Sequence, residues 1–287
     1  MRVSKYLKKW FPVFALPTTA AFLLAFVVPF ILGLYLSFTR FTTVTDAQWV
    51  GFANYQKVFD FSRGTPSFIR ALGFSSLFTI VSVITVNVCA FALAMLLTKA
   101  IKGRNVFRAI FFVPNLIGGI VLGYVWQLIL NGILKWAFEA DLTTSWVYGF
   151  WGLVLLTNWQ MIGYMMVIYI AGIQNIPSDV IEASQIDGAG FWIRLFRVTI
   201  PMVASSITIC TFLTLSNSFK LFDQNLALTD GAPGGKTQGL ALDIVNTFYK
   251  QINQEGQGQA KAVIFFVLVA GIAFIQLRAT RRREVQG

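Results

Sequence analysis

The side chains that most often carry out chemistry are scarce in this chain. Its 287 residues include no histidine, and its two cysteines, Cys89 and Cys210, each lie inside an apolar run. We find no Ser/His/Asp set, no HExxH motif and no phosphate-binding loop in the sequence. The pattern therefore predicts no catalytic centre, no metal site and no disulfide framework. We expect a chain that is not an enzyme.

The acidic residues are placed where they cannot serve chemistry inside a membrane. All 12 carboxylates lie outside the long apolar segments. Ion-coupled carriers usually keep ionisable groups within the bilayer, although a charge at its centre costs on the order of 3 kcal/mol. Lys261 is the one basic residue near such a segment, and we expect it to snorkel to the outer surface. This placement argues against a secondary carrier but leaves a stand-alone facilitator open.

Composition predicts the class of the elements. Of all residues 56% are hydrophobic and 12% are charged, whereas about a quarter are charged in a soluble domain. About 20 apolar residues in a helix cross a bilayer. The first long run resembles a signal peptide but exceeds its usual length, so we interpret it as an uncleaved span. We predict an all-α polytopic membrane protein, one transmembrane domain over 1–287, with six transmembrane helices near 13–38, 72–98, 107–130, 147–173, 200–221 and 257–278.

The net charge of +11 is distributed unevenly between the loops. If both termini are cytoplasmic, 14 of the 23 basic residues and only four acidic residues face the inside. Such an excess of Lys and Arg is typical of cytoplasmic loops. It explains the basic composition without a nucleic-acid partner. We therefore predict a multi-pass protein of a bacterial cytoplasmic membrane, with both termini inside.

One cytoplasmic loop, residues 177–200, has the pattern of a helical hairpin. Asp179 and Glu182 have the spacing of a capping box at the start of a short helix. Gly188 can turn the chain through a left-handed conformation, and apolar residues recur at helical spacing after it. Pro201 suits the first turn of the next span. The hairpin could dock into a soluble partner or lie flat among lipid headgroups, and the residues alone favour neither.

The same segment resembles the EAA loop of binding-protein-dependent ABC importer permeases. Glu182, Ala183, Gly188 and Pro201 match that pattern at the right spacing, with Ser184, Val198 and Ile200 as mild departures. The resemblance implies the permease fold and a coupling helix that docks in a groove of a separate cytoplasmic ATPase. The residues expected to carry this coupling are Asp179, Glu182, Ala183, Ser184, Asp187, Gly188, Ala189, Phe191 and Phe196.

A second resemblance covers most of the chain. Five segments are similar to the carbohydrate-uptake, maltose-type branch of these permeases, namely 29–38, 50–55, 107–114, 219–223 and 228–235. The resemblance implies import of a sugar or oligosaccharide delivered by an external solute-binding protein, or of a glycerol phosphate or another polyol. It also implies a second, homologous permease subunit in a heterodimer and two ATPase subunits. ATP and Mg would be used by those ATPases, and no cofactor would be bound by this chain.

A sugar path needs aromatic faces together with amide or hydroxyl groups. Polar side chains within spans more often join helix to helix, and aromatic ones more often form interface belts. We favour the fourth and fifth spans because they flank the 177–200 loop. The residues predicted to line the path are Asn158, Trp159, Tyr164, Thr214, Asn217 and Phe219.

Overall fold

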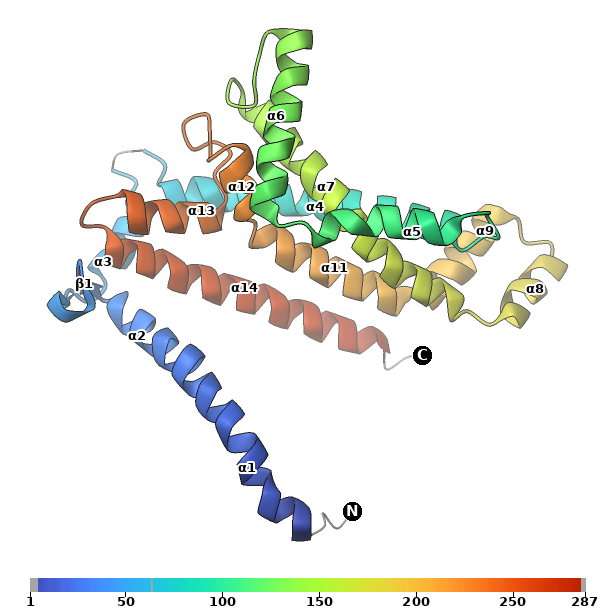
Figure 1. Cartoon of the computed structure of the whole chain (residues 1–287), viewed down its shortest axis with the longest axis horizontal. Coiled ribbons are helices and arrows are strands. Elements are labelled where there is room, and N and C mark those ends of the chain that lie inside the picture. The colour runs from blue at the N-terminus through green and yellow to red at the C-terminus, as the bar shows by residue number, and fades with distance from the viewer. Residues whose placement is uncertain (1–4, 63, 285–287) are drawn as a thin grey trace. The chain divides into compact units, whose positions relative to one another are not determined.

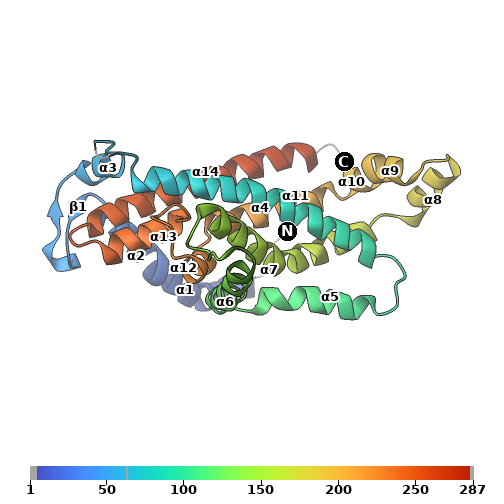
Figure 2. The same ribbon diagram turned by 90° about the horizontal axis from the view of Figure 1, so that it is seen from above.

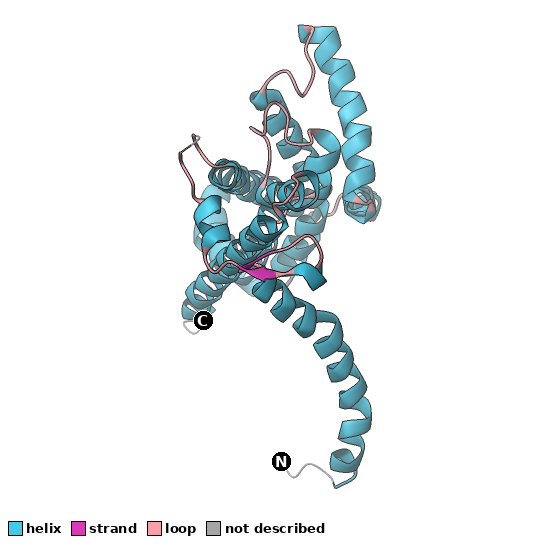
Figure 3. Cartoon of the chain, turned by 90° about the vertical axis from the view of Figure 1, so that its left-hand side faces the viewer, coloured by secondary structure: helices cyan, strands magenta, loops and turns pink. Residues whose placement is uncertain are grey.

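The computed structural model describes residues 5–62 and 64–284. Most of the described chain is helical, with one short pair of strands among the helices (Figure 3), as the all-α prediction expected. The chain falls into two compact units. Unit 1 combines residues 1–66 with 244–266, and unit 2 combines residues 67–243 with 267–287.

Unit 1 begins with a long apolar helix. α1 (Lys5–Phe22) continues through a π-helical turn (Leu23–Val27) into α2 (Val28–Leu36), drawn in blue in Figure 1. Its apolar part, Phe11–Leu36, has 26 residues. A helix of this length can cross about 30 Å of hydrocarbon. The first predicted span therefore lies where the sequence placed it.

A compact turn follows this helix within unit 1. β1 (Thr39–Arg40) pairs antiparallel with β2 (Gln48–Trp49), and α3 (Ala53–Val58) comes next. Asn54 Nδ2 donates to the carbonyl oxygens of Ser37 and Thr39 at 2.9 and 2.8 Å. Gly256, in the first turn of α14 (Glu255–Glu284), lies so close that a Cβ there would be 2.3 Å from the Thr39 carbonyl oxygen. A side chain at this position would push α14 off the turn.

The prediction that Lys261 snorkels to the surface is wrong. Its side chain is 1% exposed, and its Nζ donates to Thr247 Oγ1 at 2.6 Å. Thr247 belongs to a π-helical turn (Asn246–Lys250) that follows α13 (Leu240–Val245). A buried ammonium group requires hydrogen-bond acceptors. Unit 1 supplies one beside α14, so the side chain can stay inside.

Three long helices form the core of unit 2. α4 (Ser67–Leu97), α7 (Trp146–Gln174) and α11 (Ala204–Phe219) pack against one another, as Figures 1 and 2 show. One apolar cluster along the first halves of α4 and α7 contains Phe74 and Phe150. A second cluster along their later halves contains Tyr169 and reaches Cys210 of α11. These two clusters hold the ends of α7 in fixed positions relative to its neighbours in unit 2.

The third predicted span, 107–130, is not one helix. α5 (Arg104–Phe112) ends in a 3-10 turn (Val113–Leu116), and α6 (Gly119–Phe138) starts anew. Figure 1 shows α6 standing across the direction of α5. Pro114 lies in the turn between them, and a proline has no N–H to continue a helix. Of the two helices, Gly119–Phe138 is the one long and apolar enough to cross a membrane.

The fifth predicted span is also broken. The helical stretch Phe191–Met202 comprises α9 (Phe191–Arg194), a π-helical turn (Leu195–Thr199) and α10 (Ile200–Met202), and it meets α11 at 72°. Pro201 lies just before the bend and removes one backbone donor. Within the described chain five helices can span a membrane, or up to six if this bent pair counts as one. The predicted number of spans fits the latter count.

The absence of a side chain at one position of α7 lets α5 pack closely against it. Gly163 of α7 faces the backbone of α5, where a Cβ would lie 1.8 Å from the carbonyl oxygen of Phe111. Real Cβ atoms do not approach an oxygen so closely, so only glycine fits here. The close approach positions the turn after α5, including Asn115, beside the middle of α7.

Candidate functional site

The loop between α7 and α11 forms the predicted helical hairpin. α8 (Ser178–Ile186) ends at Gly188, whose φ of 76° is left-handed. Gly188 N donates to the Gln185 carbonyl, and Ala189 N donates to the Ser184 carbonyl, both at 3.0 Å. This pair of bonds is the Schellman arrangement that favours glycine at the turn. Gly188 therefore performs the turning role that its place in the sequence predicted.

The start of α8 differs from the prediction. Pro177 precedes the helix as its N-cap residue, and no side-chain bond caps the first turn. Asp179 lies within the first turn, where Ser178 Oγ donates to its Oδ1 at 3.2 Å. The capping box of Asp179 with Glu182 does not form, because the N-cap position falls two residues earlier than expected. Asp179 still suits its place, since a carboxylate stabilises the amino end of a helix.

The hairpin exposes most of the residues predicted for coupling. Glu182, Ala183 and Asp187 are exposed, whereas Ser184 bonds the Ile181 carbonyl through its hydroxyl at 2.6 Å and is half-buried. Large apolar side chains are exposed alongside them. The most open of these is Ile186 at 85%, and the others are Val180, Phe191, Trp192, Ile193 and Phe196. An exposed apolar patch of this kind on a projecting element makes the hairpin a candidate docking surface.

A polar pocket of about 320 Å³ lies in unit 2 where α7, α11 and α12 (Asp223–Leu228) meet the turn after α5. Only Met161, Leu221 and Phe222 among its lining residues are apolar. Its lining residues are Asn115, Thr157, Gln160, Met161, Asn217, Lys220, Leu221, Phe222, Asp223 and Gln224. Amides, a hydroxyl and one charge of each sign can bond the hydroxyl groups of an uncharged polyol.

A chain of side-chain hydrogen bonds organises this polar pocket. Gln160 Nε2 donates to the Ile117 carbonyl at 3.1 Å, and Gln224 Nε2 donates to Gln160 Oε1 at 2.7 Å. Gln160 is 9% exposed, so its amide is fixed by these bonds rather than by water. Thr157 Oγ1 is buried without a hydrogen-bond partner. Buried hydroxyls without a partner are uncommon in folded proteins, so Thr157 is an unusual member of the lining.

The structure scatters the six residues predicted for a sugar path. Asn217 lines the polar pocket. Asn158 Nδ2 donates to Thr85 Oγ1 at 2.9 Å and so joins α7 to α4. Trp159 packs edge-on against Trp126, and Tyr164 against Phe112. Thr214 is fully buried and faces Asn87 Nδ2 at 3.5 Å, and Phe219 is buried as well.

Sequence reasoning missed the residues that surround Asn217. Thr157 and Gln160 lie three residues apart on α7, so they share one face of the helix with Met161. That spacing was visible in the sequence. The contributions of Asp223 and Gln224 were not, because they come from a short helix outside the predicted span 200–221, and Lys220 lies at the bend that follows α11.

Comparison with known proteins places the chain in a family. Residues 99–284 match the family described as binding-protein-dependent transport system inner membrane component. A protein of Thermoanaerobacterium thermosulfurigenes, named as the probable starch degradation products transport system permease protein AmyD, is 42% identical, covering 99% of this chain and 98% of that protein. The multiple sugar-binding transport system permease protein MsmF of Streptococcus mutans is 29% identical, covering 99% and 100%.

Solved structures agree on the fold. A bacterial ABC transporter involved in the import of the acidic polysaccharide alginate contains a chain with a TM-score of 0.82 and 20% identity, covering 97% of this chain and 98% of that one. The methionine ABC transporter MetNI contains one with a TM-score of 0.56 and 19% identity, covering 75% and 95%. The family match and the 42% identical relative cover the EAA-like hairpin that first indicated the relationship. The chain belongs to the family of binding-protein-dependent transport system inner membrane components.

Proposed function

We propose that this chain is a membrane-spanning permease subunit of an ATP-driven importer, and that its cargo is a sugar or an oligosaccharide delivered by an external solute-binding protein. The observation that carries the coupling role is the hairpin of residues 177–200. It exposes apolar side chains around a left-handed glycine, and the chain has no phosphate-binding loop of its own. A separate ATPase subunit is the partner that such a surface requires.

The polar pocket supports a carbohydrate cargo. The side-chain amides of Gln160 and Gln224 are bonded to each other and so held in place, while the hydroxyl of Thr157 lacks a partner. Sugar hydroxyls both donate and accept, so they match such a mixed lining. The printed names of the two relatives, which refer to starch degradation products and to multiple sugars, point the same way. Asn217 and Gln160 are the residues that we assign to the cargo path.

The remaining partners follow from the same proposal. A single chain presents one hairpin, whereas an importer of this type pairs two membrane subunits with two ATPase subunits. We assign a second, homologous permease to the other half of the pore. The coupling residues are the exposed members of the hairpin, above all Glu182 and the apolar side chains beside Gly188. ATP and Mg are bound by the ATPases and not by this chain.

Two matched substitutions test the coupling role. Ile186→Asp places a charge on the hairpin, and Ile252→Asp places one in unit 1 on an isoleucine that is 87% exposed. Because neither side chain is packed, both variants are expected to fold. Co-purification of the ATPase subunit should be lost for Ile186→Asp and kept for Ile252→Asp. If Ile186→Asp retained both the ATPase and uptake, the hairpin would not be the coupling surface.

The cargo is tested by uptake in cells and by binding of the solute-binding protein to the assembled importer. The panel contains malto-oligosaccharides, a monosaccharide, glycerol 3-phosphate and, as a solute that is not a sugar, an amino acid. Uptake of a sugar that requires both this chain and ATP supports the proposal. Uptake of glycerol 3-phosphate alone would assign the cargo to a phosphorylated polyol, and solute movement by the purified chain in liposomes without ATP would overturn the importer itself.

A further inference from the structure

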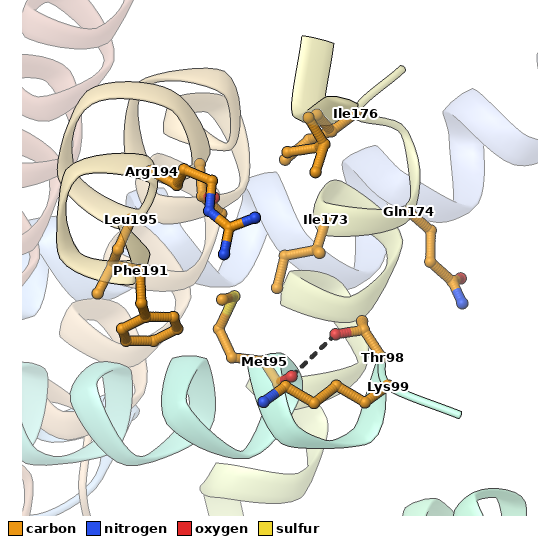
Figure 4. Close-up of a pocket in the computed structure, with 11 residues that line it drawn as sticks. Met95, Thr98, Lys99, Ile173, Gln174, Ile176, Phe191, Arg194 and Leu195 are labelled. Atoms are coloured by element: carbon orange, nitrogen blue, oxygen red, sulfur yellow. Dashed lines mark hydrogen bonds between the residues drawn. The ribbon is translucent and has the colours of Figure 1, made fainter. Parts of the chain in front are cut away.

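A second hollow, about 460 Å³, lies in unit 2 between the hairpin and the ends of α4 and α7. We call it the hairpin pocket. Most of its wall is apolar, formed by Met95, Ile173, Ile176, Ile181, Phe191 and Leu195. Figure 4 shows Met95 on α4 below, Ile173 and Ile176 at and just after the end of α7 on one side, and Phe191 and Leu195 on the helical stretch that begins with α9 on the other. None of them belongs to the polar pocket, so this is a separate site.

Two cations enter the hairpin pocket. Lys99 extends along it from the end of α4, and Arg194 reaches into it from α9 (Figure 4). Arg194 is half-buried. Among the described residues that line the pocket there is no carboxylate. Lys99 is exposed. Two cations that line one hollow without a carboxylate among them attract an anion.

The end of α4 does not account for Lys99. Cations commonly gather at the carboxyl end of a helix because its last carbonyl oxygens lack partners. Here the Met95 carbonyl already accepts from Thr98 Oγ1 at 3.1 Å, and the Leu97 carbonyl accepts from Arg108 Nη2 at 2.8 Å. These donors satisfy the helix end next to the pocket. The ammonium of Lys99 is therefore available to a ligand.

We propose that the hairpin pocket binds the phosphate ester of an anionic amphiphile, with Arg194 and Lys99 on the phosphate oxygens and an apolar chain against the wall. Arg offers planar paired donors to phosphate, and Lys adds a point charge. The source that fits both halves of the lining is an acidic phospholipid of the cytoplasmic leaflet. The pocket lies at the ends of two membrane-spanning helices on the basic side of the chain, where acidic headgroups attract Lys and Arg.

Such a ligand would connect parts of unit 2 that the chain itself joins only loosely. Lys99 lies at the end of α4, whereas Arg194 belongs to the hairpin. A phosphate between them would hold the hairpin against α4. If the hairpin contacts an ATPase, as the proposed function states, occupancy of the pocket would then favour one position of the coupling surface.

Retention of lipid by the full chain, purified with its partner subunits, tests the site without reference to transport. The double variant Lys99→Gln, Arg194→Gln removes both cations. The matched control Lys102→Gln, Arg197→Gln removes two exposed cations that do not line the pocket. Native mass spectrometry counts retained phosphatidylglycerol, and thermal shifts compare phosphatidylglycerol with phosphatidylcholine. We expect roughly tenfold weaker retention of phosphatidylglycerol for the double variant and less than a twofold change for the control.

Further arms fix the chemistry and its source. The charge-conserving variant Lys99→Arg, Arg194→Lys should keep most of the retention, which excludes simple misfolding. Glycerol 3-phosphate in solution should not displace the lipid; displacement at equal concentration would move the source to a soluble phosphate ester. Equal losses in the double variant and the control would overturn the site. So would a structure of the assembled importer in which Lys99 and Arg194 pair with carboxylates of the ATPase. Failure of ATPase coupling would leave the lipid result unaffected, so the two proposals can fail separately.

Discussion

The middle of α7 and the hairpin beyond its end present opposite exceptions to the usual distribution of polar and apolar groups. Near its middle, Thr157 and Gln160 place polar groups in a buried pocket. Beyond its end, the hairpin places Ile186, Trp192 and Phe196 in the open. Buried polar groups are costly unless bonded, and exposed apolar clusters are rare unless covered. The proposed function accounts for both exceptions, with a polar cargo in the first case and a protein partner in the second.

A single packed helix, α7, lines the polar pocket at its middle and leads into the hairpin at its end. The two apolar clusters of unit 2 lie along α7, one at each half. α5 adds a third contact at Gly163, between Gln160 and the hairpin. A change at the hairpin can therefore reach the polar pocket through a packed element instead of a flexible loop. Substitutions confined to the hairpin, to the polar pocket or to the α5–α7 contact change one part of this arrangement at a time.

The largest effect is expected from Gly163→Ala. The new Cβ would meet the Phe111 carbonyl oxygen at 1.8 Å, and backbone atoms cannot rotate out of the way. α5 must move off α7, which we expect to destabilise the protein by about 3 kcal/mol or more. Thermal unfolding in detergent measures the loss. Gly73→Ala in α4, where nothing lies within 4 Å, is the matched control and should leave the midpoint unchanged. A normal midpoint for Gly163→Ala would mean that α5 and α7 are not in close contact.

A smaller effect is expected from Gly188→Ala, which acts on the hairpin end alone. No atom lies within 4 Å of a Cβ at this position, so the cost is the left-handed φ of 76°, about 1–2 kcal/mol for alanine. The turn should open and ATP-driven uptake should fall, while the unfolding midpoint changes little. Gly188→Asn should restore uptake, because asparagine tolerates this conformation. Gly190→Ala, with an ordinary φ of −66° and open space, is the control. Equal uptake in both alanine variants would show that the turn geometry does not matter.

The third prediction concerns the polar pocket. Gln160→Leu removes the bonds to the Ile117 carbonyl and to Gln224 and leaves both partly buried groups unpaired. At about 1–2 kcal/mol for such a loss, cargo uptake at low concentration should fall roughly tenfold. ATPase co-purification should be normal. Gln127→Leu also removes one amide bond to a backbone carbonyl, that of Leu228, but does not line the pocket. If both variants reduced uptake equally, the polar pocket would have no special role in the cargo path.

The hairpin could be predicted from the sequence and the polar pocket could not, for a physical reason. The hairpin depends on residues adjacent in the chain: Gly188 N and Ala189 N donate to the carbonyls of Gln185 and Ser184 through local bonds. The pocket depends on contacts between segments far apart. Gln160 meets Gln224 only because a proline turn and a short helix bring α5, α7 and α12 together. For the same reason, Pro201 was recognised as a residue of the first turn of a span, yet the 72° bend after it was not, and the predicted span 107–130 ran through the break at Pro114.

The smallest effect concerns Asp141, a carboxylate whose needs are met locally. Its Oδ1 accepts from Thr143 Oγ1 at 2.6 Å and Thr143 N at 2.8 Å, and these bonds hold the pKa of Asp141 below its ordinary value of 3.8. The stabilisation is therefore fully present above that value and is lost as the pH falls through the lower, folded-state pKa. Thr143→Val should raise the pKa toward 3.8 because one donor is gone, as carboxyl NMR shifts would show. Unlike the hairpin and the polar pocket, this loop satisfies its polar groups with its own residues. Its titration should not respond to ATPase subunits or to cargo, and a response to either would mean that the coupling spreads beyond the packed helices of unit 2.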